Sequence, residues 1–146
     1  MKILVKKLRE NAKLPVYQTA LSAAADLYVC LDGPLTLYPS QRVKLPTGIA
    51  IEYDDENVAA VICARSGLSA KHGISLTNGI GLVDPDYRGE LLVSVVNLSD
   101  QPYTFENGER VAQLMFLPVI RGRFEEAETL SETGRGEGGF GSTGKA

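Results

Sequence analysis

Two stretches of the chain bring together side chains that suit a phosphate ligand. In Arg65-Ser66-Gly67 a guanidinium, a hydroxyl and a glycine amide follow one another. Near the end of the chain, Arg135 stands among glycines, and Phe140 is the only aromatic side chain from Ser131 onward. Glycine lets backbone amides approach phosphate oxygens closely, and arginine adds a bidentate clamp for an anion. We therefore expect the first stretch to contact phosphate and the second to cover it as a lid.

Both stretches also have a simpler structural interpretation. Ser66 could cap the amides of a short helix predicted around Ser66 to Lys71, with Arg65 as an ordinary surface residue beside it. The glycine-rich end could be a tail that frays without any ligand. On these residues alone, the alternatives stay open.

Two familiar nucleotide motifs match the tail in form but not in context. Gly136 to Gly141 fits GxGxxG, yet no strand leads into it and no helix can follow. Gly139 to Lys145 fits GxxxxGK, but Ala146 stands where Ser or Thr would hold Mg²⁺. Neither a dinucleotide fold nor a P-loop is expected.

A third stretch, Thr77 to Glu90, gathers several carboxylates, a phenol and a tight turn. Asn78-Gly79 lies between two apolar runs and predicts the tip of a β-hairpin. Tyr87 follows a proline turn and, taken alone, is equally well a core residue. The lone histidine, His72, is more typical of a surface or packing residue than of a catalytic one.

Composition limits the classes of protein to which the chain can belong. Its 146 residues, of which 44% are hydrophobic and 23% charged, suit one globular domain. A net charge of −3 provides no general basic field for a nucleic acid. No apolar run is long enough for a membrane span, and the N-terminus lacks signal-peptide features. Cys30 and Cys63 lie far apart in apolar surroundings, which predicts two buried thiols in the reducing cytoplasm.

Hydrophobic periodicity predicts an all-β domain that positions these stretches. Short strands are expected over Leu27–Leu31, Ile49–Tyr53, Val58–Cys63, Leu91–Val96 and Val111–Leu117, separated by turn-rich segments. This spacing favours a sandwich or barrel over residues 1–130, with a single short helix. Residues 131–146 are expected to form a flexible glycine-rich arm.

Five segments, taken in order, resemble the motifs of the trimeric deoxyuridine triphosphatases (dUTPases, or dUTP diphosphatases). No single segment is specific, but five in the same order, spread over a chain of the right length, argue against coincidence. The segments are Ala23 to Tyr28, Arg65 to Leu68, Asn78 to Gly89, Gly108 to Leu114, and Arg135 to Ser142.

The resemblance implies a jelly-roll-like subunit in a homotrimer. Each active site would draw on three chains, and the arm of one chain would close over a pocket between the two others. The implied reaction is hydrolysis of dUTP to dUMP and pyrophosphate by water attack on the α-phosphorus. It would keep uracil out of DNA and supply dUMP for thymidylate synthesis. Mg²⁺ is the implied cofactor, held mainly by triphosphate oxygens and waters.

The resemblance also implies roles for individual residues. Asp84 would orient and deprotonate the attacking water, and Ser66 would stabilise the charge that grows on the leaving group. Asp26 would make an outer-shell contact to Mg²⁺ through water. Tyr87 would exclude a 2′-hydroxyl, and Phe140 would stack on uracil. The complete set implied to contact substrate is Arg65, Ser66, Gly67, Asn78, Leu82, Val83, Asp84, Tyr87, Gln113, Arg135, Phe140, Gly141 and Ser142.

Two other functions fit parts of the same pattern. A dCTP deaminase of the same fold would also bind a pyrimidine deoxynucleoside triphosphate, but its third motif and tail would differ from Tyr87-Arg88-Gly89 and the arm with Phe140. A non-enzymatic trimer that senses nucleotides would keep the fold without the chemistry. The presence of Asp84, Ser66 and Arg135 together argues for the enzyme.

Overall fold

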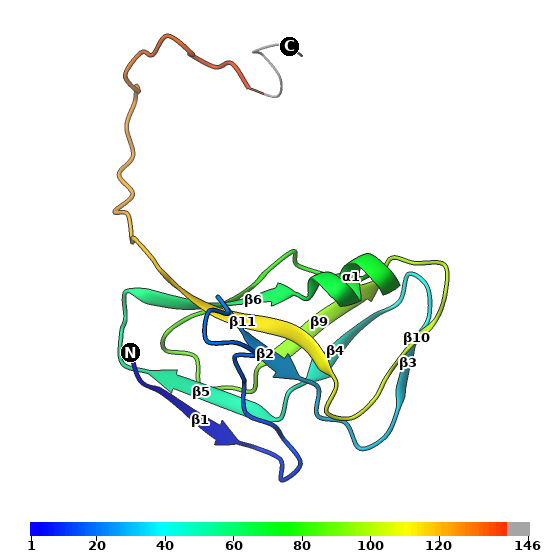
Figure 1. Ribbon diagram of the computed structural model, residues 1–146. Coiled ribbons are helices and arrows are strands. Elements are labelled where there is room, and N and C mark those ends of the chain that lie inside the picture. Colours follow the sequence, from blue (N-terminus) through cyan, green and yellow to red (C-terminus); the bar gives the residue numbers. More distant parts are fainter. Residues whose placement is uncertain (140–146) are drawn as a thin grey trace.

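The computed structural model describes residues 1–139, and nearly all of its regular structure is strand (Figure 1). The predicted Phe140, Gly141 and Ser142 lie outside the described residues. The elements are β1 (Ile3–Lys7), β2 (Ala25–Tyr28), β3 (Leu35–Leu37), β4 (Arg42–Pro46), β5 (Ile49–Tyr53), β6 (Val58–Ala64), α1 (Ser66–His72), β7 (Ile74–Leu76), β8 (Gly81–Val83), β9 (Leu92–Asn97), β10 (Tyr103–Phe105) and β11 (Arg110–Pro118).

The strands form four antiparallel groups that pack as a jelly-roll-like sandwich. The largest sheet has the order β2-β11-β6-β8, and a second has the order β4-β9-β7. Two further pairs, β1-β5 and β10-β3, complete the described part of the chain. The prediction of an all-β subunit with one short helix is confirmed for these residues, and the sheets do not close into a barrel.

One hydrophobic core joins the larger sheets. Alternate residues of β9 point inward, so that Val93 and Val95 are buried while Leu92 is exposed. They pack in one cluster with Leu27 from β2 and Leu114 from β11. Four of the five predicted strands match within one residue at each end, and β5 matches to the residue, whereas the predicted Leu27–Leu31 shares only Leu27 and Tyr28 with β2. The other strands are short or partly exposed, and their periodicity is too weak to detect.

The predicted helix is confirmed, but Ser66 does not cap it. Arg65 is the N-cap residue, without a side-chain capping bond, and Ser66 is the first helical residue. The helix ends at Gly73, whose φ of 66° lets its amide bond back to the carbonyls of Leu68 and Ser69. The prediction of a serine cap was therefore wrong, and the Ser66 hydroxyl is not used to start the helix.

Asn78-Gly79 does not form the tip of a hairpin. The strands on either side, β7 and β8, pair with β9 and β6 respectively, so the turn carries the chain from one sheet to another. Gly79 has a φ of 73°, the left-handed conformation that the turn requires. The turn signal was correct, but the partners of the strands are set by contacts distant in sequence.

The end of the described chain leaves the body as an extended segment (Figure 1). Its last contacts with the body are made by Val119 and Arg121, which donate to the carbonyls of Asn57 and Glu56. Beyond them, the side chain of Phe124 is 99% exposed. The predicted boundary at residue 130 stays a prediction, while the described chain separates from the body some ten residues earlier.

Both cysteines are free, Cys30 buried and Cys63 partly buried. Burial raises the pKa of the Cys30 thiol, whose Sγ donates to Asn11 Oδ1 at 3.0 Å. Among residues 1–139, no helix is long and apolar enough to cross a membrane.

Replacing Gly73 with alanine should destabilise the fold by about 2 kcal/mol, because the residue needs a positive φ and an added Cβ would lie 2.8 Å from the Ser99 amide nitrogen. Urea denaturation followed by circular dichroism would measure this change. Gly33→Ala is the matched control, since nothing lies within 4 Å of a Cβ there. Equal stability of the two variants would contradict the prediction.

Candidate active site

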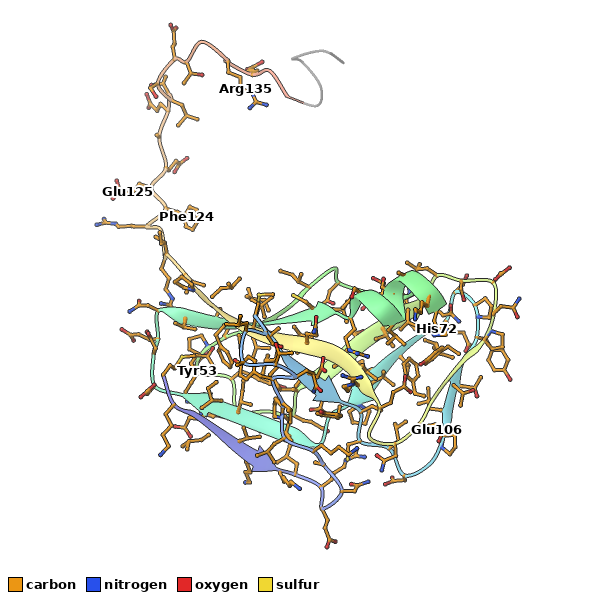
Figure 2. All side chains as sticks on the ribbon, viewed as in Figure 1. Tyr53, His72, Glu106, Phe124, Glu125 and Arg135 are labelled. Atoms are coloured by element: carbon orange, nitrogen blue, oxygen red, sulfur yellow. The ribbon has the colours of Figure 1, made fainter. Side chains whose placement is uncertain are left out.

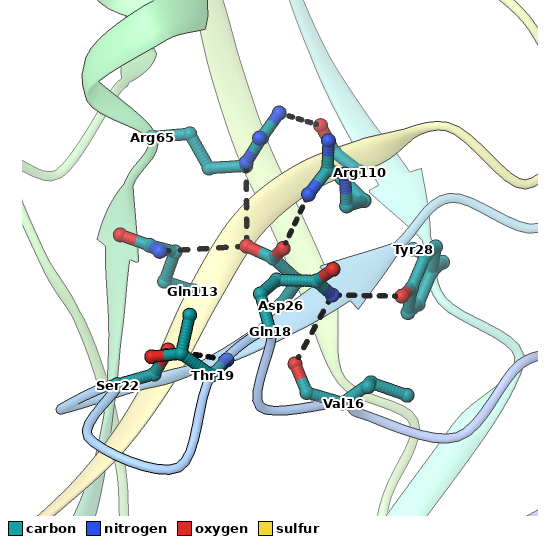
Figure 3. Close-up of polar contacts among 9 residues, drawn as sticks. All are labelled: Val16, Gln18, Thr19, Ser22, Asp26, Tyr28, Arg65, Arg110 and Gln113. Carbon is teal, nitrogen blue, oxygen red and sulfur yellow. Dashed lines mark hydrogen bonds and ion pairs between the residues drawn. The ribbon is translucent and has the colours of Figure 1, made fainter.

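A buried carboxylate gathers the predicted phosphate-binding side chains (Figure 3). Asp26 on β2 is 2% exposed. Its Oδ2 accepts a hydrogen bond from Arg110 Nη1 at 3.1 Å, and its Oδ1 accepts one from Gln113 Nε2 at 3.4 Å. The Nε of Arg65 lies 3.3 Å from Oδ1 as an ion pair. Three elements therefore meet at one side chain.

A β-bulge lets two residues of β11 reach the same carboxylate. In a regular strand Arg110 and Gln113, three positions apart, would point to opposite faces. The register between β11 and β2 shifts between Arg110 and Ala112, and this irregularity turns Arg110 toward the face of Gln113. Arg110 also holds Arg65 by a second route, because its carbonyl accepts a hydrogen bond from Arg65 Nη1 at 2.9 Å.

This cluster carries one unit of positive charge, from two guanidiniums and one carboxylate. The Nε of Arg65 is buried, and its ion pair with Asp26 is not aligned as a hydrogen bond. The guanidinium is held in place, and its donors are only partly used by the described residues. A positively charged, oriented guanidinium next to the start of α1 suits the oxygens of a phosphate.

Ser66 and Gly67 stand immediately beyond Arg65 and are both exposed. Among residues 1–139, no hydrogen-bond partner of the Ser66 hydroxyl is found, and a Cβ on Gly67 would meet nothing within 4 Å. The structure thus brings together Asp26, Arg65, Ser66, Gly67 and Gln113. Within this group, Ser66 and Gly67 are the residues exposed to solvent.

A second group of predicted residues surrounds a cavity of about 220 Å³. The turn residue Asn78 lies at one side, and Leu82 and Val83 of β8 lie along another. Asp84 directly follows β8 and is exposed at the cavity, with Tyr87 close by. This arrangement places a carboxylate beside a small, mostly apolar space, which suits a planar base or sugar.

The ring of Tyr87 packs directly against the backbone of Gly89. Its Oη donates to the carbonyl of Glu90 at 3.0 Å, and a Cβ at Gly89 would overlap that Tyr87 oxygen. Only glycine at position 89 leaves room for the ring in this position. The phenol is therefore held at the border of the cavity and does not belong to the hydrophobic core.

Asp84 also borders a wider hollow of about 660 Å³. Three further carboxylates line it, from Asp54, Glu56 and Asp86, together with Arg88 and Arg121. The excess of negative charge disfavours a triphosphate there. The smaller cavity beside Tyr87 is the better candidate for nucleotide binding.

The two groups lie apart within one subunit. Val83 pairs with Ala60 on β6, and Arg65 lies five residues after Ala60, directly after the end of that strand. At about 3.3 Å per residue of strand, this places the two groups roughly 16 Å apart. One chain therefore does not bring Asp84 to the phosphate cluster around Arg65.

The third predicted group is not assembled within the described subunit. Arg135 lies on the extended segment, far from the body in Figure 2, and its Nε donates to the carbonyl of Gly138 at 2.7 Å. Phe140, Gly141 and Ser142 remain predictions, because they fall outside the described residues.

One participant had no role assigned from the sequence. Arg110 lies within a segment quoted for the resemblance, but its contact with Asp26 depends on the β-bulge, which leaves no sequence signal. The outer-shell metal contact predicted for Asp26 stays a prediction, and both of its oxygens already have partners in the subunit.

The described residues do not fit a metal ion held by the protein. Among residues 1–139, no group of three His, Cys, Asp or Glu side chains is placed to bind one. Asp26 is surrounded by guanidiniums, which disfavour a cation in direct contact with it.

Comparisons with known proteins agree on one family. A family model described as dUTPase matches residues 10–144. A deoxyuridine 5′-triphosphate nucleotidohydrolase of Desulfitobacterium hafniense is 50% identical over 144 residues, covering 99% of this chain and 95% of that protein.

Solved structures agree with the match in sequence. The dUTPase of Staphylococcus bacteriophage 80alpha with dUPNHPP has a TM-score of 0.88 and 26% identity, covering 99% of both chains. A mutant dUTPase from phage phi11 of S. aureus, described with a structural Mg(II) ion, has a TM-score of 0.80 and 20% identity, covering 90% of this chain and 100% of that one. The second likeness supports the fold alone.

Asp26→Asn should destabilise the protein by about 2 kcal/mol, because it leaves two guanidiniums close together without their shared counter-charge. The value is at the low end for a broken buried pair, since both arginines keep some contact with water. Denaturation midpoints would measure the change. Glu125→Gln, which removes an exposed partner of Arg123, is the control and should leave the midpoint unchanged. A midpoint for Asp26→Asn equal to that of the control would contradict the prediction.

Proposed function

Because this chain belongs to the dUTPase family, we propose that it hydrolyses dUTP to dUMP and pyrophosphate by water attack on the α-phosphorus. The observation that carries the proposal is Asp84, an exposed carboxylate beside a cavity bordered by Asn78, Leu82 and Tyr87. The dUTPase of phage 80alpha, similar over 99% of the chain, is described with dUPNHPP, which supports a deoxyuridine nucleotide as the ligand.

Asp84 acts as the base in this mechanism. Its carboxylate orients a water molecule toward the α-phosphorus and takes up the proton as the new P–O bond forms and the bond to pyrophosphate breaks. No covalent intermediate is needed. Arg65, Ser66 and Gln113 bind the phosphates, and the hydroxyl of Ser66 stabilises the charge that develops on the leaving oxygen.

The cavity beside β8 selects the base and the sugar. Backbone groups from Asn78 to Val83 read the uracil edge, where two carbonyls flank one N–H, so that cytosine would leave buried polar groups unpaired. The ring of Tyr87, held above Gly89, packs against deoxyribose and leaves no room for a 2′-hydroxyl. We assign to Phe140 the role of stacking on uracil and to Gly141 and Ser142 a role in binding the substrate.

The metal ion enters with the substrate, as the Mg²⁺ complex of dUTP. The described residues offer no cage for it, whereas triphosphate oxygens and waters are ligands that Mg²⁺ prefers. Bound in this way, the ion would supply positive charge that offsets the charge on the phosphates. The guanidinium groups of Arg65 and Arg110 contribute the remaining positive charge.

The active site is shared among the three chains of a homotrimer. The separation of roughly 16 Å between the Asp84 group and the Arg65 group supports this arrangement, because one α-phosphate needs both. The extended segment after Arg121 supports it too, since its exposed Phe124 and Leu130 suit burial against another subunit. Arg135 then reaches the γ-phosphate of a neighbouring site.

Hydrolysis of dUTP serves two purposes in this proposal. It removes a nucleotide that would place uracil in DNA, and it supplies dUMP for thymidylate synthesis. We place the enzyme in the cytoplasm, where its free thiols Cys30 and Cys63 stay reduced.

A test of the reaction compares dUTP, dTTP, dCTP and UTP in the presence of Mg²⁺. Only dUTP should release pyrophosphate rapidly, and Asp84→Asn should lower kcat by about 1000-fold because the base is lost. Asp100→Asn, in the exposed turn between β9 and β10, should keep wild-type activity. Ammonia released from dCTP would identify a deaminase, and binding of dUTP without turnover would leave a nucleotide sensor.

Mixed trimers test the shared site. Asp84→Asn and a chain truncated after Gly134 should each be inactive, yet their mixture should regain activity after subunit exchange. Some sites would then receive Asp84 from one chain and an intact arm from another. Mass spectrometry of the intact assemblies would verify exchange. Verified mixed trimers without activity would overturn the arrangement.

A further inference from the structure

Tyr53 connects two sheets next to the candidate base. It is the last residue of β5, which pairs only with β1, and its side chain reaches into the sheet that contains β6 and β8 (Figure 2). Its Oη accepts a hydrogen bond from the amide of Ala60 at 3.2 Å. The same oxygen lies 3.3 Å from the carbonyl of Val58 and 3.4 Å from the carbonyl of Val83.

The hydroxyl is the only side-chain group in the described residues that joins these backbone positions. A phenol has one proton, so it donates to one carbonyl at a time or shares the proton between both. Ala60 is fully buried, so removing the hydroxyl would take this acceptor from its amide in a place that water does not reach. The hydroxyl thus holds both β6 and the end of β8.

Val83 directly precedes Asp84. β8 is an edge strand of three residues, paired on one side by β6 alone. At its last residue, the contact from the hydroxyl of Tyr53 to the Val83 carbonyl adds a hold from a different sheet. The peptide group that carries Asp84 is therefore fixed from two directions.

The phenol itself has little freedom. Tyr53 is 7% exposed, and its ring meets the ring of Phe116 edge to face, with centroids 5.3 Å apart. Burial raises the pKa of the Tyr53 hydroxyl, and the nearby Asp84 carboxylate raises it further. The hydroxyl therefore keeps its proton at neutral pH and can donate throughout the working range of the enzyme.

We propose that Tyr53 is a positioning residue for Asp84, which it serves by fixing the carbonyl of Val83 and the amide of Ala60. In this role Tyr53 acts through the backbone and not by contact with substrate, and the inference rests on the proposed function of Asp84 as base. Small displacements of a catalytic group slow the chemical step while leaving substrate binding largely intact.

Tyr53→Phe tests this, because it removes a single oxygen. We expect kcat for dUTP to fall about tenfold, with KM and the Kd for an α,β-imido analogue of dUTP changed by less than about twofold. Hydrogen exchange in residues 84–88, where Pro85 has no amide proton and the Tyr87 amide donates to the Asp84 carbonyl, should become about fivefold faster, while β9 and β11 keep their protection. Exchange in this segment does not depend on any activity.

Thr47→Val is the matched control. It also removes one buried hydroxyl, which donates to the carbonyl of Leu91 at 2.7 Å, and it should lower stability without lowering kcat. If Tyr53→Phe does not fold, Phe116→Leu replaces it, because it loosens the ring and keeps the hydroxyl. For Phe116→Leu we expect a fall in kcat smaller than tenfold, with faster hydrogen exchange again confined to residues 84–88.

The outcomes separate this inference from the proposed function. A wild-type protein inactive on dUTP overturns the function, and the exchange of residues 84–88 then decides alone whether Tyr53 holds the segment. With an active wild type, unchanged kcat and unchanged exchange in Tyr53→Phe overturn the positioning role. Faster exchange throughout the protein also overturns it, because the hydroxyl would then support only the fold.

Discussion

The proposed phosphate-binding half of the site depends on one buried carboxylate, Asp26, that several side chains share. Asp26 receives a guanidinium from the end of β6, a guanidinium and an amide from β11, and it lies on β2, so a single charge orders three segments distant in sequence. Burying a carboxylate is unfavourable unless it is paired with a positive charge, and here two guanidinium groups pair with the single carboxylate. The surplus positive charge is shared by Arg65 and Arg110, whose side chains both keep contact with solvent, where an anion can neutralise it. The same interaction therefore stabilises the fold and orients the guanidinium groups that would bind an anionic ligand.

The geometry of β6 has a second consequence for the site. This strand carries Arg65 at one end and pairs with β8, and so with Asp84, nearer its other end. A rigid antiparallel sheet prevents the two from approaching each other within a chain. The proposed mechanism needs both groups at one phosphorus. Under that proposal, association of chains joins them, and the need for an oligomer follows from the length of the strand.

The sequence predicted what depends on local patterns and on ordered motifs. β5 and the start of α1 follow from a β-branched run and from the Arg65-Ser66-Gly67 stretch, and Asp84, Tyr87 and Gln113 came from the resemblance. Other features depend on non-local partners. Asn78-Gly79 predicted a turn correctly, but not that its flanking strands join different sheets. The bulge that turns Arg110 toward Asp26, and the reach of Tyr53 to Val83, arise from packing between distant segments.

The extended segment beyond Arg121 also sets how the proposed lid responds to dilution. Arg135 lies fourteen positions after Arg121, so a fully extended tether spans up to about 46 Å. The length of the tether confines the lid to the neighbourhood of the trimer. The effective concentration of the lid at a binding site is therefore of the order of millimolar. Its closure is then an intramolecular step, independent of how much protein is present as long as the three chains stay together. The arm adds binding strength through its attachment, and its individual contacts with the nucleotide can remain weak enough for the product to leave.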